Sequence, residues 1–281
     1  MVTLVAMPKP FEGHIGTIQR NAITSWTLLR PRPEIILLGN EVGVAEISAE
    51  LNLRNIPEIK RNDKSTPYLD DIFAKAQHAA SQPIVCYVNS DIILPSDFIR
   101  TVAGVSAWRG QFLMAGRRWD MDITQPIDFS KSDWETLLRE DVGRRGKKRS
   151  ASWVDYFVFP RGMYKNVPPM LLGRMWWDNW LVWKALDMGA PVVDASPRVR
   201  AIHQNHGYGH PGGFLGIWKS EEGQWNERLV DGGRDARTLR NANYKYGRFG
   251  IRLNFEGAIE SWWKSLKPRK KNAVATAEKA G

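Results

Sequence analysis

The first half of the chain alternates short apolar runs with segments whose apolar residues recur every three or four positions. The apolar runs predict strands at residues 2–7, 34–38, 56–59 and from 84 up to a polar turn at 89–91. The helical spacing predicts helices at residues 14–29, 44–51 and 68–80. Four strands that alternate with three helices predict an α/β protein with a parallel, doubly wound sheet.

The second half continues the pattern less regularly. It predicts helices at 98–105 and 177–188, and strands at 111–116, 153–159, 191–194 and 199–202. Residues 121–150 are polar and basic, and are expected to form an insertion or a mobile loop. We expect residues 1–254 to form one domain, followed over 255–281 by an amphipathic helix and a basic disordered tail.

The most informative segment is the buried-looking strand that runs into Asn89-Ser90-Asp91. Its turn places a carboxylate at the carboxyl edge of the predicted sheet, where open α/β sheets bind ligands. An amide and a carboxylate two residues apart can reach a divalent cation that holds phosphate oxygens. The alternative is an Asx-turn that only closes the strand.

Composition narrows the class of protein. The chain has 281 residues, enough for one large or two small domains. Its single cysteine, Cys86, excludes a disulfide framework and a cysteine-based zinc site, and weakly favours a reducing compartment. The N-terminus lacks a basic region, so it predicts a strand and not a signal peptide. No apolar stretch approaches the roughly 18 residues of a membrane span, so we expect a cytoplasmic protein, soluble or peripheral.

The net charge of +10 implies attraction to anions such as phosphates, nucleic acid or an acidic membrane face. Much of it lies in two basic runs, at 139–149 and 264–271. These runs lack the interleaved aromatic residues of a stacking platform, so no nucleic-acid partner is expected. Their simplest interpretation is a solvated loop and a solvated tail.

Three histidines lie within eight residues, at His203, His206 and His210. Imidazole is a common ligand of transition metals. One of them could join Asp91 on a single cation, although packing or surface histidines would show the same spacing.

Two further segments carry candidate chemistry. Asp178 stands where a helix should begin, either as its N-cap or as an acid in an acceptor pocket lined by tryptophans. Arg117 and Arg118 follow a strand and could bind a diphosphate, or could pair with Asp120 or Asp122.

Together these elements resemble the GT-A class of nucleotide-sugar glycosyltransferases. Asn89-Ser90-Asp91 looks like a variant of the Asp-x-Asp motif that ends the fourth strand of that fold. The order from Trp176-Trp177-Asp178-Asn179 through a helix and a strand to His203 is similar to polypeptide N-acetylgalactosaminyltransferases and mannosylglycerate synthase-like enzymes. The resemblance implies a GT-A (Rossmann-like) α/β domain with a mixed, mainly parallel sheet flanked by helices.

The resemblance also implies an activity, which is transfer of a hexose from a nucleotide-diphosphate donor to a glycan, lipid-linked or small-molecule acceptor. Mn²⁺ or Mg²⁺ would be held by Asp91 and His203. We predict His206 as a further ligand, although the extra histidines His206 and His210 leave the choice of ligand open. The donor would lie at strand ends and turns: Pro8, Lys9, Glu41, Arg61, Asn89, Ser90, Arg117 and Arg118. Asp178 or Asp155 would act as base, and Trp177 and Asn179 would contact the acceptor. Asn89 replaces the first aspartate of the motif, which should weaken cation binding.

Two other classes of function stay open. A nucleotidyltransferase shares this fold but usually needs a glycine-rich basic loop after the first strand, which residues 8–13 do not provide. A non-catalytic glycan- or nucleic-acid-binding protein could use the 13 tryptophans or the basic runs.

The last apolar pattern, at 255–266, predicts an amphipathic helix beside a basic cluster. We expect it either to pack on the domain or to dock on an anionic membrane face. Docking would make the protein peripheral at the inner face of the membrane.

Overall fold

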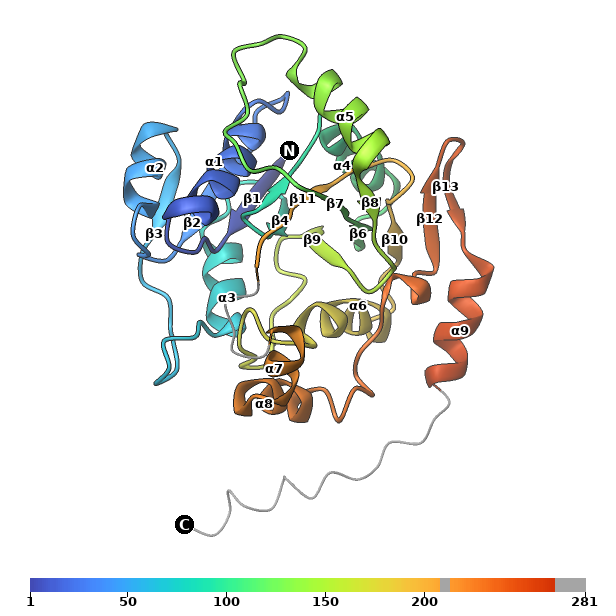
Figure 1. Ribbon diagram of the computed structural model, residues 1–281. Coiled ribbons are helices and arrows are strands. Elements are labelled where there is room, and N and C mark those ends of the chain that lie inside the picture. Colours follow the sequence, from blue (N-terminus) through green and yellow to red (C-terminus); the bar gives the residue numbers. More distant parts are fainter. Residues whose placement is uncertain (208–212, 266–281) are drawn as a thin grey trace.

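The computed structural model describes residues 1–207 and 213–265, in which two sheets are flanked by helices (Figure 1). The large sheet has the strand order β13-β12-β10-β6-β9-β4-β1-β2-β3. Its strands are β1 (Val2–Ala6), β2 (Glu34–Leu38), β3 (Arg54–Ile56), β4 (Ile84–Val88), β6 (Leu113–Arg117), β9 (Val154–Pro160), β10 (Val192–Asp194), β12 (Tyr244–Gly247) and β13 (Gly250–Leu253). Only β9 and β13 pair antiparallel to their neighbours in this part of the chain, so the sheet is mixed and mainly parallel, as predicted.

The small sheet continues from the carboxyl ends of the large one. Its strands, in the order β5-β11-β7-β8, are β5 (Ile92–Ile93), β11 (Ile202–Gln204), β7 (Trp119–Met121) and β8 (Lys147–Lys148). Strand β5 directly follows β4, and β7 directly follows β6. Both β5 and β7 pair with β11, so β11 lies next to the carboxyl ends of β4 and β6. Its residue His203 is in register with Ile92 on one side and Asp120 on the other.

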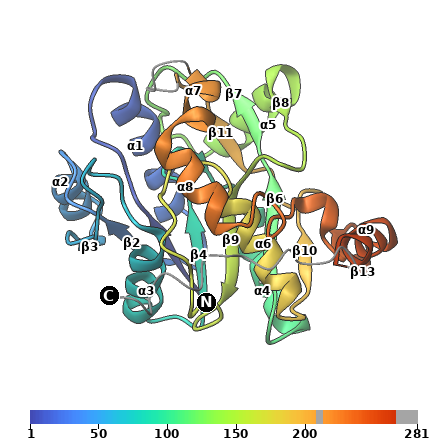
Figure 2. The same ribbon diagram turned by 90° about the horizontal axis from the view of Figure 1, so that it is seen from below.

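Helices cover both faces of the large sheet (Figure 2). They are α1 (Gly13–Thr27), α2 (Val44–Glu50), α3 (Leu69–Ala79), α4 (Asp97–Trp108), α5 (Trp134–Arg145), α6 (Trp177–Asp187), α7 (Gly213–Lys219), α8 (Glu221–Leu229) and α9 (Phe255–Ser265), with a 3₁₀ turn η1 (Leu239–Asn241). Trp26 of α1 and Phe98 of α4 belong to the core on one face. Phe73 of α3 and Trp180 of α6 belong to the core on the other. Strands buried from both sides explain the continuous apolar runs in the sequence.

Several segments differ from the sequence-based expectation. The third strand occupies 54–56 and not 56–59, and the last predicted strand occupies 202–204 and not 199–202. The segment 121–150, expected to be an insertion or a mobile loop, includes helix α5 and strand β8. Val142 is the buried residue of α5, so this helix has almost no apolar stripe for a sequence pattern to detect.

The C-terminal helix forms where the apolar spacing predicts it, beginning at Phe255. The polar tail expected from residue 268 lies outside the described residues. Among the residues that the structure describes, no helix is both long enough and apolar enough to cross a membrane.

Candidate active site

Three side chains from two distant parts of the sequence converge at the carboxyl end of β4. Nε2 of His206 lies 2.9 Å from Oδ2 of Asp91, and Nε2 of His203 lies 3.6 Å from the same oxygen. One potential ligand atom from each residue lies within 4.8 Å of the other two. The structure therefore brings together the three residues that were predicted as metal ligands.

The backbone around Asp91 is fixed by the buried side chain of Gln204. Gln204 Nε2 donates to the carbonyl of Asp91 at 3.1 Å and to the carbonyl of Ile18 at 2.7 Å. The backbone N–H of Gln204 also donates to the Asp91 carbonyl, at 3.3 Å. These bonds tie the β4–β5 turn to β11 and α1, so Asp91 and His203 keep a defined separation.

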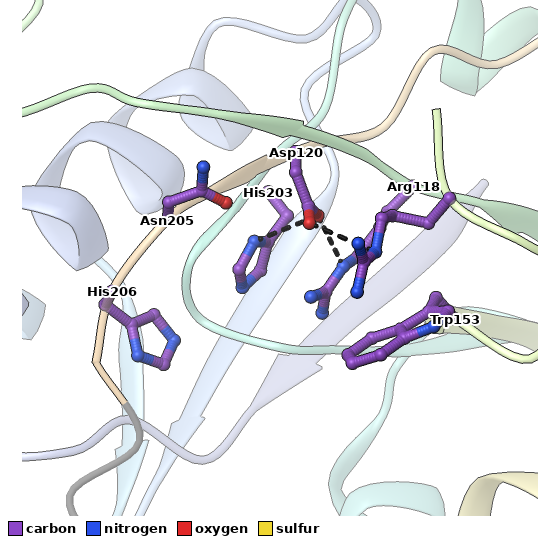
Figure 3. A pocket seen from close by; sticks show the side chains of 7 residues that line it. Arg118, Asp120, Trp153, His203, Asn205 and His206 are labelled. Carbon is purple, nitrogen blue, oxygen red and sulfur yellow. Dashed lines mark hydrogen bonds and ion pairs between the residues drawn. The ribbon is translucent and has the colours of Figure 1, made fainter. Parts of the chain in front are cut away.

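Asp120 of β7 holds the other side of the His203 ring. Its Oδ1 lies 3.3 Å from Nδ1 of His203 and accepts from Nε of Arg118 at 2.8 Å. Figure 3 shows Arg118 and His203 both directed at this carboxylate. A carboxylate next to Nδ1 favours the tautomer that carries its proton on Nδ1. The lone pair of Nε2 is then on the side of Asp91, where it could bind a cation, an arrangement seen in many metal-bound histidines.

These groups border an open pocket of about 390 Å³. It is lined by Arg118, Asp120, Arg149, Trp153, His203, Asn205 and His206. The guanidinium groups of Arg118 and Arg149 lie 4.6 Å and 4.2 Å from the ring of Trp153. The pocket thus combines two cations and an aromatic ring with the carboxylate–histidine cluster (Figure 3).

The carboxylates of the cluster have lowered pKa values, so they carry the negative charge that a bound cation requires. Burial alone would raise the pKa of Asp91, but the hydrogen bond from His206 and the charges of His203, His206 and Lys9 outweigh it and lower this pKa to about 2. The hydrogen bond to Asp91 raises the pKa of His206. For Asp120, burial is likewise outweighed, here by His203, Arg118 and Arg149, so its pKa is lowered.

Asn89 and Asp155 form a connected pair below the pocket. Nδ2 of Asn89 donates to Oδ1 of Asp155 at 2.7 Å, and NH1 of Arg118 lies 3.1 Å from Oδ2 of Asp155. An aspartate at position 89 would bring a second carboxylate against Asp155, so the amide fits this environment better than the family residue would. Asp155, one of the two carboxylates expected as a base, is thus held by Arg118 and Asn89.

The two arginines expected at a diphosphate are placed differently. Arg118 lines the pocket and pairs with Asp120 and Asp155, which is the ion-pair alternative that the sequence left open. Arg117 does not line the pocket, and its backbone N–H donates to Oγ of Ser196. Arg118 follows directly after the end of β6, where the chain turns towards β7.

The ends of β1, β2 and β3 gather the other expected donor residues. Pro8 is buried, whereas Lys9 is exposed and its charge acts on Asp91. The side chain of Gln19 binds both Lys9, through its backbone N–H at 2.7 Å, and the hydroxyl of Ser90, at 2.8 Å. Glu41 and Arg61, from the ends of β2 and of the segment after β3, form an ion pair of 2.6 Å.

The expected acceptor residues lie at the start of α6. The helix is preceded by Trp176 as its N-cap, so Asp178 lies in the first turn and is not the cap. Burial, reinforced by the charge of Asp155, raises the pKa of Asp178 to about 7.

Trp177 and Asn179, expected to contact an acceptor, have structural contacts. Trp177 is only 6% exposed and packs against the rings of Tyr87 and Phe157. Nδ2 of Asn179 donates to the carbonyl of Arg237 at 3.1 Å. Trp177 is therefore part of the apolar core between the large sheet and α6.

Sequence reasoning missed several residues of the site. Arg149, Trp153 and Asn205 line the pocket, and Asp120 was considered only as a partner for an arginine. Each lies beside a predicted element but outside any spaced motif, so their position at the pocket became visible only in the tertiary structure. His210, part of the histidine cluster in the sequence, lies outside the described residues.

Neither a protein-family model nor a curated protein matches this chain. Among solved structures it is similar to glucosyl-3-phosphoglycerate synthase from Mycobacterium tuberculosis in complex with Mn²⁺, UDP and phosphoglyceric acid, with a TM-score of 0.50 and 16% identity. That match covers 82% of this chain and 78% of the synthase. S. aureus TarS in complex with UDP-GlcNAc matches with a TM-score of 0.51 and 11% identity, over 82% of this chain and 65% of that one.

A second complex of the synthase, with Mn²⁺, UDP and glucosyl-3-phosphoglycerate, matches with a TM-score of 0.50 and 16% identity, over 82% of this chain and 79% of that one. At such identities the similarity establishes the fold. The chain has the GT-A fold of nucleotide-sugar glycosyltransferases, as the resemblance implied.

Proposed function

We propose that this protein is a metal-dependent glycosyltransferase that moves a hexose from a nucleotide-diphosphate donor to a glycan, lipid-linked or small-molecule acceptor. The observation that carries the proposal is the convergence of Asp91, His203 and His206 at the carboxyl end of β4 in a GT-A fold. The similar structures bind Mn²⁺ together with UDP, which supports a donor of this chemical class.

The three side chains fit a divalent cation. Oδ1 of Asp91 is buried and has no hydrogen-bond partner among the described residues, a costly arrangement unless a cation binds there. One carboxylate and two imidazoles suit Mn²⁺ better than Mg²⁺, which prefers oxygen ligands. The low pKa of Asp91 keeps this ligand ionised at neutral pH. If His206 donates a proton from Nε2 to Asp91, that proton would have to be released when a metal binds.

A divalent cation bound here would act as a Lewis acid for the leaving diphosphate. The chain itself contributes positive charge from Lys9 on one side of Asp91 and from Arg118 and Arg149 in the pocket. Trp153 packs against both guanidinium groups, and this contact fixes their positions. We assign Lys9, Ser90 and the Glu41–Arg61 pair to the nucleotide side of the donor.

For the acceptor hydroxyl, Asp178 is the stronger candidate base of the two carboxylates. Asp155 is held by Arg118 and Asn89, whereas burial raises the pKa of Asp178 to about 7, close to the value that suits proton transfer at neutral pH. Such a base serves an inverting reaction, and a retaining reaction would not need it.

The proposal is tested by calorimetric titration with UDP and GDP in the presence and absence of Mn²⁺, followed by a donor-hydrolysis screen over several nucleotide sugars. We expect nucleotide binding that depends on Mn²⁺ and a donor that is slowly hydrolysed. Absence of any nucleotide binding would favour a non-catalytic glycan- or nucleic-acid-binding protein. Release of pyrophosphate from a nucleoside triphosphate and a sugar phosphate would favour a nucleotidyltransferase.

The assignment of the metal ligands is tested with Asp91→Ala. Removing the charged ligand should weaken Mn²⁺ binding by about 100-fold or more and abolish metal-dependent hydrolysis. Asp63→Ala, at an exposed position on the loop before α3, is the matched control. Unchanged Mn²⁺ affinity in Asp91→Ala would show that the assignment is wrong.

A further inference from the structure

Helix α9 has an exposed apolar stripe opposite the face by which it is attached. Phe255, Ile259, Trp262 and Trp263 are between 55% and 69% exposed. These positions recur at the spacing of a single helical face. We call them the α9 stripe.

The attachment of α9 fixes the direction of this stripe. A Cβ at Gly257 would lie 2.1 Å from the carbonyl oxygen of Ala242 and 2.8 Å from that of Arg240, so the helix sits with Gly257 against the chain around η1. Asn254 strengthens this seat by donating from Nδ2 to the Ala242 carbonyl at 2.7 Å. At about 100° per residue, the α9 stripe is centred on the side of the helix away from Gly257.

The hairpin that precedes α9 adds exposed cations and another apolar side chain. Lys245 and Arg252 are exposed and directly opposite each other in the β12–β13 pair, where like charges destabilise. Phe249 at the turn is 74% exposed, and the guanidinium groups of Arg248 and Arg252 lie within 5.8 Å and 5.1 Å of its ring. An anionic surface would relieve this concentration of positive charge.

The hairpin and α9 lie together at one edge of the molecule, at the end of the large sheet away from β3 (Figure 1 and Figure 2). Basic residues dominate the sequence that follows, in which residues 266–281 carry Lys267, Arg269, Lys270, Lys271 and Lys279 against Glu278. The acidic residues of the helix are Glu256, which is exposed, and Glu260, whose charge acts on Arg237.

We propose that the α9 stripe and the β12–β13 hairpin form a docking surface for an anionic lipid bilayer. Tryptophan and phenylalanine side chains insert at the headgroup boundary, while arginine and lysine bind the anionic headgroups, a combination typical of peripheral helices. A second copy of this chain is a poorer occupant, because both copies would bring the same cations to the contact and each has a net charge of +10. This surface is separate from the residues that line the pocket.

The test is sedimentation of the full chain with phosphatidylcholine vesicles that contain or lack phosphatidylglycerol. We expect binding at least about tenfold tighter to the anionic vesicles, and a loss of that binding as salt is raised. The double variant Trp262→Ala/Trp263→Ala should bind at least about tenfold more weakly, whereas Trp225→Ala, an exposed tryptophan on α8, should bind as the parent does.

Charge is tested with Arg248→Ser/Arg252→Ser against the matched pair Arg144→Ser/Arg145→Ser on α5. We expect only the hairpin pair to weaken binding, and circular dichroism melts confirm that all variants fold. Equal binding to neutral vesicles, or no binding to either, would overturn the proposal. So would a dimer in solution that Trp262→Ala/Trp263→Ala dissociates, because the stripe would then be a contact between two copies.

Discussion

At the scale of single residues, three neighbouring aspartates acquire different properties from their surroundings. Asp91 has histidine neighbours and one oxygen without a partner, so it is suited to a cation. Asp155 is neutralised by Arg118, and Asp120 lies between that arginine and His203. The same side-chain chemistry therefore suits Asp91 for a cation, Asp155 for an ion pair and Asp120 for orienting a histidine ring.

The role of Asp120 predicts the behaviour of Asp120→Asn. Loss of the carboxylate charge should leave the His203 ring less strictly oriented, so we expect Mn²⁺ affinity to fall by about 10- to 100-fold. Calorimetry measures the affinity, and ¹⁵N NMR of the imidazoles reports the His203 tautomer. Asp128→Asn, an exposed position before α5, is the control. Affinity and tautomer populations equal to those of the parent would contradict a positioning role.

At the scale of elements, helices are held in place by close backbone contacts at glycines as well as by buried apolar faces. Helix α9 shows this most clearly, because its exposed stripe cannot anchor it and its seat depends on a glycine against the Ala242 carbonyl. Helix α5 provides the contrast. Its Gly143 has open space, with the nearest atom, NH1 of Arg200, 3.9 Å from an added Cβ.

These two glycines predict opposite outcomes for the same substitution. Gly257→Ala should destabilise the protein by about 1–3 kcal/mol, because the methyl group meets backbone atoms that cannot move aside. Gly143→Ala should instead stabilise it by about 0.5–1 kcal/mol through helix propensity alone. Urea unfolding of both variants measures the difference. A stabilising Gly257→Ala would mean that α9 is not seated as described.

At the scale of the whole molecule, a pH-dependent electrostatic cost lies where β9 meets α6. Burial and the charge of Asp155 raise the pKa of Asp178 from 3.8 to about 7. The folded protein therefore binds this proton more tightly than the unfolded chain does. Its contribution to stability is complete below about pH 4 and is lost as the pH rises through 7.

Asp178→Asn should remove this dependence. We expect the variant and the parent to have similar stability near pH 4, and the variant to become the more stable as the pH rises to 8, by at most about 4 kcal/mol. Chemical denaturation at several pH values measures the effect, with Asp63→Asn as an exposed control. A stability difference that does not change with pH would contradict the raised pKa.

Much of the fold could be read from local pattern. Strands β1, β2 and β4 follow apolar runs because both of their faces are buried, and helices α1, α3 and α6 follow apolar spacing because one side of each meets the sheet. Helix α5 escaped prediction, since a helix with one buried residue has no periodic signal. The hairpin of β12 and β13 escaped for a similar reason, being short and largely exposed.

The sequence by itself determined the α/β fold, because apolar runs and apolar spacing are visible along the chain. Its strand-to-turn motif and dense histidine cluster, together with the family resemblance, singled out Asp91, His203 and His206. Only the tertiary structure decided how those residues are supported. It placed Asp120 behind His203, paired Arg118 with Asp155, buried Trp177 in the core and turned the α9 stripe outward. The physical reason is that apolar periodicity records which side of an element is buried. The partners of a polar side chain depend on which strands become neighbours, and that is settled only when the sheets assemble.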